Sequence, residues 1–184
     1  MDFKEQTLED IIWDNAQDLE GRKVLSDRGL YITGTIYRQV ELGSYGRADL
    51  VTVDYDSYKD IINITIYELK KGRIDVNALM QAARYVTALE RHGFITEIWK
   101  HKVEYKICLI GDSYDSKSDF AFLYNETKNF DIFTYEYDIT GIYFYRVSKW
   151  WSQTNEVKNE ETIKTISADL ISQIKKISCD DSSE

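Results

Sequence analysis

Two carboxylates and a lysine occur at spacings that could hold a divalent cation beside a phosphate group. Asp49 begins one apolar segment, and Glu68 and Lys70 end the next. Successive side chains of a strand point to opposite faces, so Glu68 and Lys70 share a face and Leu69 points away from it. A hairpin joining the two segments would bring Asp49 beside Glu68. Oxygen ligands so placed hold Mg²⁺ or Mn²⁺ next to a phosphate, which predicts metal-dependent hydrolysis of phosphodiester bonds.

The expected metal ligands are the side chains of Asp49 and Glu68 and the main-chain carbonyl of Leu69. Lys70 has a role that carboxylates cannot fill, because an ammonium group can orient the attacking water and balance charge in the transition state. Lys71 would point to the opposite face, toward solvent or a phosphate. An isolated Glu-x-Lys triplet is more often a surface cross-strand pair, so the metal site is predicted only from its combination with neighbouring motifs.

Gln81 and Tyr85 lie one turn apart in a segment with helical periodicity, so they share a helix face. That face would look toward the site, where Gln81 could hydrogen-bond water or phosphate and Tyr85 could contact the substrate. The alternative is a polar rim residue beside a core tyrosine. Guanidinium groups suit phosphate oxygens, although single surface arginines are common. The arginines near the motifs are therefore candidates for substrate contacts, together with Lys71: Arg47, Arg73 and Arg84.

In their order along the chain, these motifs resemble the PD-(D/E)xK superfamily of restriction-endonuclease-like nucleases, in particular the catalytic domain of NucS-type endonucleases. The resemblance covers residues 5–147, and Ala48 stands where the family often has proline. It implies endonucleolytic cleavage of DNA that leaves a 5′-phosphate and a 3′-hydroxyl. It also places Glu9, otherwise an ordinary helix-surface acid, beside the metal as a catalytic residue. The matching residues are Leu8-Glu9-Asp10, Gly46-Arg47-Ala48-Asp49-Leu50, Glu68-Leu69-Lys70-Lys71-Gly72, and Gln81 with Tyr85.

The elements that must position these residues follow from hydrophobic patterning. We expect an α/β fold with a restriction-endonuclease-like αβββαβ core, in which a central mixed sheet is flanked by helices. Periodicity predicts helices over 7–18 and 75–91, the second ending at Gly93. Alternating or continuous apolar runs predict the strands, with a turn at 43–46 and an acidic loop before the final hairpin: 29–42, 48–54, 61–70, 105–110, 130–137 and 141–147.

Residues 1–150 are expected to form one nuclease-like domain, which 151–178 extend with a C-terminal helix. Residues 179–184 are expected to be an acidic disordered tail. An apolar stripe along the last helix predicts that it packs against the parent domain of a monomer, and a homodimer through this helix is the alternative. The stripe consists of Ile163, Ile166, Leu170, Ile174 and Ile177.

Bulk properties indicate an ordinary globular chain, since 43% of the 184 residues are hydrophobic and 14% are aromatic. The absence of an apolar run of about 18 residues and of a signal-like N-terminus predicts a cytoplasmic protein with no membrane partner. The net charge of −9 argues against DNA binding, which commonly uses a basic surface. Basic residues nevertheless gather around the motifs, whereas acids concentrate at 112–119 and 180–184, and the local field is what steers a substrate.

The sequence therefore predicts an Mg²⁺- or Mn²⁺-dependent nuclease whose partner is DNA, single- or double-stranded. Two alternatives stay open. One is a catalytically silent nuclease fold that acts as a binding or assembly module. The other is a ribonuclease, because no residue that would read a 2′-hydroxyl is identifiable.

Overall fold

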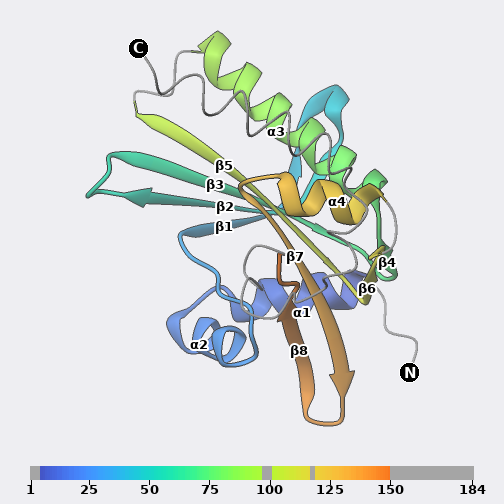
Figure 1. Ribbon diagram of the computed structural model, residues 1–184. Coiled ribbons are helices and arrows are strands. Elements are labelled where there is room, and N and C mark those ends of the chain that lie inside the picture. The colour runs from blue at the N-terminus through green and yellow to red at the C-terminus, as the bar shows by residue number, and fades with distance from the viewer. Residues whose placement is uncertain (1–4, 97–100, 117–118, 150–184) are drawn as a thin grey trace, which may run out of the picture. The chain divides into compact units, whose positions relative to one another are not determined.

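A mixed six-stranded sheet lies at the centre of the fold, and helices cover both of its faces (Figure 1). The computed structural model describes residues 5–96, 101–116 and 119–149. The helix expected over 151–178, the monomer or dimer that depends on it, and the tail 179–184 lie outside the described residues. In the part of the chain that is described, no helix is both long and apolar enough to cross a membrane.

The main sheet has the strand order β1-β2-β3-β5-β7-β8, and β4 pairs separately with β6. The helices are α1 (Glu5–Asn15), α2 (Leu19–Asp27), α3 (Val76–Thr96) and α4 (Asp119–Glu126), with a 3-10 turn, η1, at Gly43–Tyr45. The strands are β1 (Thr35–Glu41), β2 (Arg47–Asp56), β3 (Ile61–Leu69), β4 (Arg73–Ile74), β5 (Lys102–Gly111), β6 (Ser113–Tyr114), β7 (Phe130–Asp138) and β8 (Gly141–Arg146).

Strand direction changes in the middle of the sheet. β1, β2 and β3 form an antiparallel meander, whereas β3, β5 and β7 run parallel and β8 returns antiparallel to β7. The parallel step from β3 to β5 is made through α3, the kind of crossover that parallel neighbours require. The predicted α/β class, with a mixed central sheet flanked by helices and closed by a hairpin, is thus confirmed.

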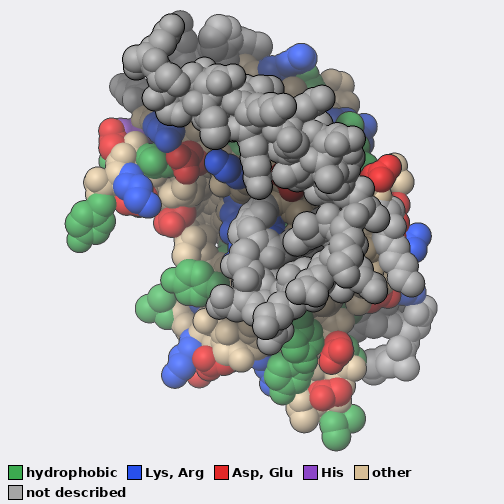
Figure 2. All heavy atoms as spheres, in the orientation of Figure 1, with side chains coloured by type: hydrophobic (Ala, Val, Ile, Leu, Met, Phe, Trp, Pro, Cys, Tyr) green, Lys and Arg blue, Asp and Glu red, His purple; other side chains and the backbone are tan. Residues whose placement is uncertain are grey.

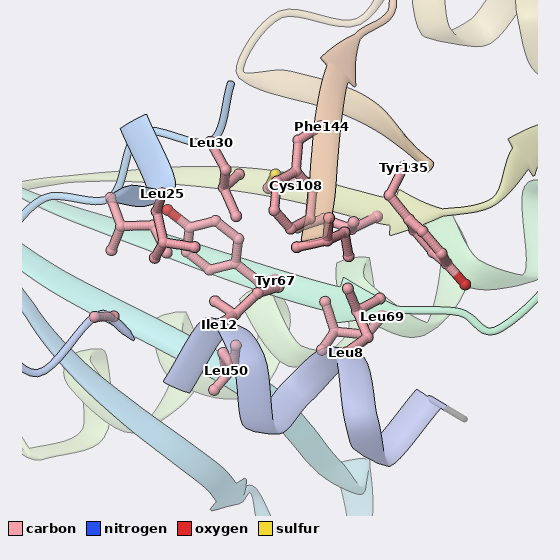
Figure 3. Close-up of a cluster of buried hydrophobic side chains, with 14 of the residues drawn as sticks. Leu8, Ile12, Leu25, Leu30, Leu50, Tyr67, Leu69, Cys108, Tyr135 and Phe144 are labelled. Atoms are coloured by element: carbon pink, nitrogen blue, oxygen red, sulfur yellow. The ribbon is translucent and has the colours of Figure 1, made fainter. Parts of the chain in front are cut away.

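Alternation along β3 explains why both faces of the sheet are covered. Tyr67 and Leu69 join the apolar core under α1, where Leu8 and Ile12 of the helix point at the sheet (Figure 3). Ile64 and Ile66 join a second core on the opposite face, under α3 and α4. Burial of each large aliphatic side chain contributes about 1.5–3 kcal/mol. Because Glu68 has the same parity as Ile66, its side chain belongs to the α3 face.

The structure corrects the predicted end of α3. The helix continues through Gly93 to Thr96, so the stop predicted at Gly93 is wrong. One glycine inside a helix costs only about 1 kcal/mol relative to alanine, which a long helix tolerates.

The first turn of α3 is capped by Asp75, whose Oδ1 accepts hydrogen bonds from the main-chain N–H groups of Asn77 at 2.9 Å and Ala78 at 3.3 Å.

Short elements account for the other differences. The strand predicted over 29–42 is shorter in the structure, because β1 begins only at Thr35 and ends at Glu41, so its first six residues, 29–34, lie outside any strand. The helix α2 has nine residues and α4 has eight, too few for a clear periodicity. The acidic loop expected after β5 contains β6 and leads into α4, which is anchored by buried Phe120 and Tyr124.

Candidate functional site

The β2–β3 ladder ends beside Asp49. Its last paired residues toward this end are Leu50 and Tyr67. Beyond this pair, the Leu69 main-chain N–H donates a hydrogen bond to the Asp49 carboxylate, with N and Oδ2 2.8 Å apart. A side chain of β2 therefore satisfies a main-chain donor of β3 at the point where the two backbones separate. This contact fixes Asp49 next to the carboxyl end of β3.

Glu68 and Lys70 form an ion pair on the α3 face of that strand end. The Lys70 ammonium donates to Glu68 Oε1 over 2.6 Å, and only 1% of the Glu68 side chain is exposed. Oε2 of the same carboxylate is buried as well. Removing a carboxylate from water is costly unless a charge or donor compensates it, and Lys70 provides one such charge. The shared face predicted from the Glu-x-Lys spacing is therefore observed as a direct contact.

A row of hydrogen bonds continues from Lys70 onto α3. Lys70 Nζ lies 3.3 Å from Gln81 Oε1, and Gln81 Nε2 donates to the Tyr85 hydroxyl over 2.8 Å. Gln81 and Tyr85 lie one turn apart, so both reach the same side of the helix. Gly46, with a φ of +110°, lies close to the tyrosine ring, and a Cβ at this position would be 3.3 Å from Tyr85 Cε1.

The charges of Glu68, Asp49 and Lys70 all act on the Tyr85 phenol. Burial raises the pKa of the Tyr85 phenol, and the negative charges of Glu68 and Asp49 raise it further. The hydrogen bond from Gln81 and the positive charge of Lys70 act in the opposite direction. A phenol with a raised pKa stays protonated at neutral pH, so Tyr85 serves here as a neutral hydrogen-bonding group.

Glu9 is buried but is bound to β1. Its Oε1 accepts from Arg38 Nε at 2.5 Å, and its Oε2 accepts from Gln39 Nε2 at 2.7 Å. Among the described residues, no group of three or more acids, histidines and cysteines is arranged to hold a metal ion. Any cation here would therefore use Asp49 and Glu68 without a third acid. Sequence reasoning missed both Arg38 and Gln39, and no local motif marks either one.

The basic candidates for substrate contacts are all exposed. Arg47 starts β2 and lies 3.7 Å from the Glu41 carboxylate. Arg73 belongs to β4, and Arg84 to α3. Lys71 directly follows Lys70, and its carbonyl accepts from the Tyr135 hydroxyl at 3.0 Å. On the face drawn in Figure 2, the described basic side chains are interspersed with acidic ones.

The donor chemistry of the site fits a small hard cation. Mg²⁺ prefers oxygen ligands, and it commonly takes only one or two carboxylates and keeps several waters. Asp49, Glu68 and the Leu69 carbonyl would supply three protein oxygens. Histidine and cysteine, which other metals favour, are not among these candidate ligands.

Asp49, Glu68, Lys70, Gln81 and Tyr85 thus come together from β2, the end of β3 and α3. Comparisons of the chain with protein-family models, curated proteins and solved structures found no match.

Proposed function

We propose that the protein is a metal-dependent nuclease of restriction-endonuclease-like topology that hydrolyses phosphodiester bonds of DNA. The observation that carries this proposal is the contact network that joins Asp49, Glu68, Lys70, Gln81 and Tyr85 at the carboxyl end of β3. With the short elements α2, η1 and β4 set aside, the order α1, β1, β2, β3, α3, β5 supports an αβββαβ core. A purely structural ion pair would not require an aspartate, a glutamine and a tyrosine around it.

Asp49, Glu68 and the Leu69 carbonyl are the proposed ligands of Mg²⁺ or Mn²⁺. When bound, such a cation supplies positive charge to the phosphate and makes a coordinated water more acidic. The chain itself fixes the two carboxylates, since Glu68 is buried and the half-buried Asp49 accepts from the Leu69 N–H. Fixed ligands of this kind need little rearrangement when substrate arrives.

Lys70 is the proposed catalytic cation of the chain. Glu68 Oε1 at 2.6 Å and Gln81 Oε1 at 3.3 Å fix its ammonium group. From this position it can orient a water and stabilise the negative charge that develops on the phosphate oxygens. Tyr85 in turn fixes the Gln81 amide.

In the proposed reaction, the water oxygen forms a bond to phosphorus and the bond from phosphorus to O3′ breaks. A proton from water ends on O3′, and the products are a 5′-phosphate and a 3′-hydroxyl. Among the exposed basic residues, we propose Arg47, Lys71, Arg73 and Arg84 as contacts to the backbone phosphates.

Cleavage of supercoiled plasmid and of labelled single-stranded DNA, with Mn²⁺, Mg²⁺ or EDTA, tests this function. Asp49→Asn is the sharpest variant, because an amide oxygen can still accept from the Leu69 N–H while the negative charge is lost. Asp54→Asn makes the same substitution five residues along the same strand, and it serves as the matched control. We expect cleavage by the wild type and by Asp54→Asn, and none by Asp49→Asn. Equal cleavage by all three proteins, or cleavage in EDTA, would refute the assignment.

A catalytically silent binding module is the second candidate. The net charge of −9 favours it, because a negative protein gains little from contact with a polyanion. This function predicts intact DNA and intact RNA under every metal condition, although Mn²⁺ could still bind. Cleavage of RNA alone in the same assay would instead identify a ribonuclease.

A further inference from the structure

One residue inside a strand has a left-handed backbone. Gln39 of β1 has a φ of +52°. Among the described residues, the other non-glycine positions with positive φ are Asp60 and Asn129. Both lie in turns and belong to residue types that tolerate this conformation. A glutamine in the interior of a strand keeps such a backbone only where its surroundings enforce it, and such positions often lie at functional sites.

Gln39 is directly opposite Asp49. Arg38 pairs with Leu50, and Val40 pairs with Ala48, so Gln39 and Asp49 are the residues between these two pairs. The strained position of β1 therefore faces the proposed metal ligand of β2.

Between these two pairs, the side chains of both strands change from one face of the sheet to the other. Leu50 packs in the core under α1, whereas Ala48 packs in the core under α3, although residues two apart in a regular strand share a face. Their partners behave in the same way, since Arg38 contacts Glu9 of α1 and Val40 packs against the α3 core. Between these two pairs, the Asp49 carboxylate reaches the Leu69 N–H of the neighbouring strand.

Glu9 accounts for the conformation of Gln39. Arg38 and Gln39 are consecutive, yet both side chains donate to the same carboxylate, over 2.5 Å and 2.7 Å. Consecutive side chains of a regular strand point to opposite faces and could not do so. The left-handed φ of Gln39 brings its amide to the α1 side, and Glu9, only 3% exposed, gains a second donor.

We infer that Gln39 is a positioning residue of the proposed catalytic site. Its backbone conformation directs the Asp49 carboxylate to the Leu69 N–H, and its amide fixes Glu9. The inference rests on the proposed function where it concerns catalysis, but the geometry that it assigns to Gln39 is independent of cleavage. Gln39 acts through Asp49 and Glu9 and contacts no substrate.

The decisive comparison is between Gln39→Val and Gln39→Gly. Glycine adopts the observed φ without strain, whereas a β-branched residue strongly disfavours it and would restore a regular strand. Asn129→Val is the matched control, because Asn129 has a φ of +54° and lies before β7. It imposes the same type of backbone strain away from Asp49. Two readouts report the site: hydrogen exchange of the Leu69 amide followed by NMR, and Mn²⁺ affinity measured by paramagnetic resonance.

We expect Gln39→Val to lose the protection of the Leu69 amide and to bind Mn²⁺ at least about tenfold more weakly, the usual effect of losing a group that supports a metal ligand. Gln39→Gly should keep the Leu69 protection, and Asn129→Val should match the wild type in both readouts. If Gln39→Val does not fold, Gln39→Ala takes its place, with the same expectation.

Identical behaviour of the valine and glycine variants at position 39, or equal losses in Asn129→Val, would overturn the inference. The two proposals fail separately. A wild type that binds no Mn²⁺ and cleaves nothing would refute the proposed function, while the Leu69 amide would still test the role of Gln39. A wild type that cleaves DNA, with a Gln39→Val variant that keeps its Leu69 protection and Mn²⁺ affinity, would refute only the role of Gln39.

Discussion

Asp49 Oδ2 accepts the Leu69 main-chain N–H over 2.8 Å, so one hydrogen bond of the sheet is completed by the side chain that we assign to metal binding. The same carboxylate therefore serves both the sheet and the proposed metal site. Under the proposed function, a substitution at Asp49 should therefore affect both stability and cleavage, and a suitable pair of variants separates the two effects.

Asp49→Ala should abolish cleavage and also lower the free energy of unfolding by about 1–3 kcal/mol, because the Leu69 N–H loses its acceptor. Asp49→Asn should abolish cleavage with a smaller loss of stability. Urea unfolding, run beside the plasmid assay, measures both effects. Equal stability of the alanine and asparagine variants would show that the hydrogen bond to Leu69 contributes nothing.

Lys70→Met should lower stability by about 3 kcal/mol, because it leaves the buried Glu68 charge without its lysine, and it should abolish cleavage. Lys102→Met is a close control, because Lys102 and Glu104 are also two residues apart on a strand and 2.6 Å apart, but both side chains are exposed. Its cost should stay below about 1 kcal/mol. Calorimetry should show that Lys70→Met still binds Mn²⁺. A metal affinity as low as that of Asp49→Ala would make Lys70 a structural residue instead.

Tyr85→Phe removes the acceptor of the Gln81 amide and should lower stability by about 1 kcal/mol. The cleavage rate should fall because Gln81, and through it Lys70, is held less firmly. The alkaline part of the pH profile should not change. The pKa of Tyr85 is raised, chiefly by burial, so the phenol does not titrate there. A profile whose alkaline limb moves in Tyr85→Phe would mean that the phenol itself transfers a proton.

Asp131 should make stability depend on acid pH. Burial opposes its ionisation, but hydrogen bonds from Lys106 and Arg146 and their charges prevail, and the pKa of Asp131 is lowered. A lowered folded-state pKa adds stability above the unfolded value of about 3.9, and this stability is lost as pH falls through the folded-state value. The stability difference between wild type and Asp131→Asn, from urea unfolding, should therefore shrink as pH falls below about 4. A difference that is the same at pH 7 and pH 3 would contradict this.

Much of the candidate site was predictable because it depends on local periodicity. Residues two apart on a strand, such as Glu68 and Lys70, share a face of the sheet. Residues four apart on a helix, such as Gln81 and Tyr85, share a face of that helix. A short connection between β2 and β3 then brings Asp49 to Glu68. These contacts involve residues that are near in sequence or joined by one hairpin, so they can be predicted from the sequence alone.

The surroundings of Glu9 were not predictable in the same way. Its partners Arg38 and Gln39 are 29 and 30 residues away, and their shared contact depends on a backbone conformation that glutamine rarely adopts. The strands β4 and β6 were likewise not predictable, because two residues carry no periodicity of their own.

The hydrogen-bonded row from Glu68 through Lys70 and Gln81 to Tyr85 also bears on how such a chain could change in evolution. Loss of one member removes a hydrogen bond from its neighbour in the row, which costs stability where that neighbour is buried, as Glu68 and Tyr85 are. Under the proposed function, a descendant that had lost the activity would therefore gain stability by replacing Glu68, Lys70 and Gln81 together with apolar residues of similar size. Intact polar residues at all three positions are what continuous selection for catalysis would maintain.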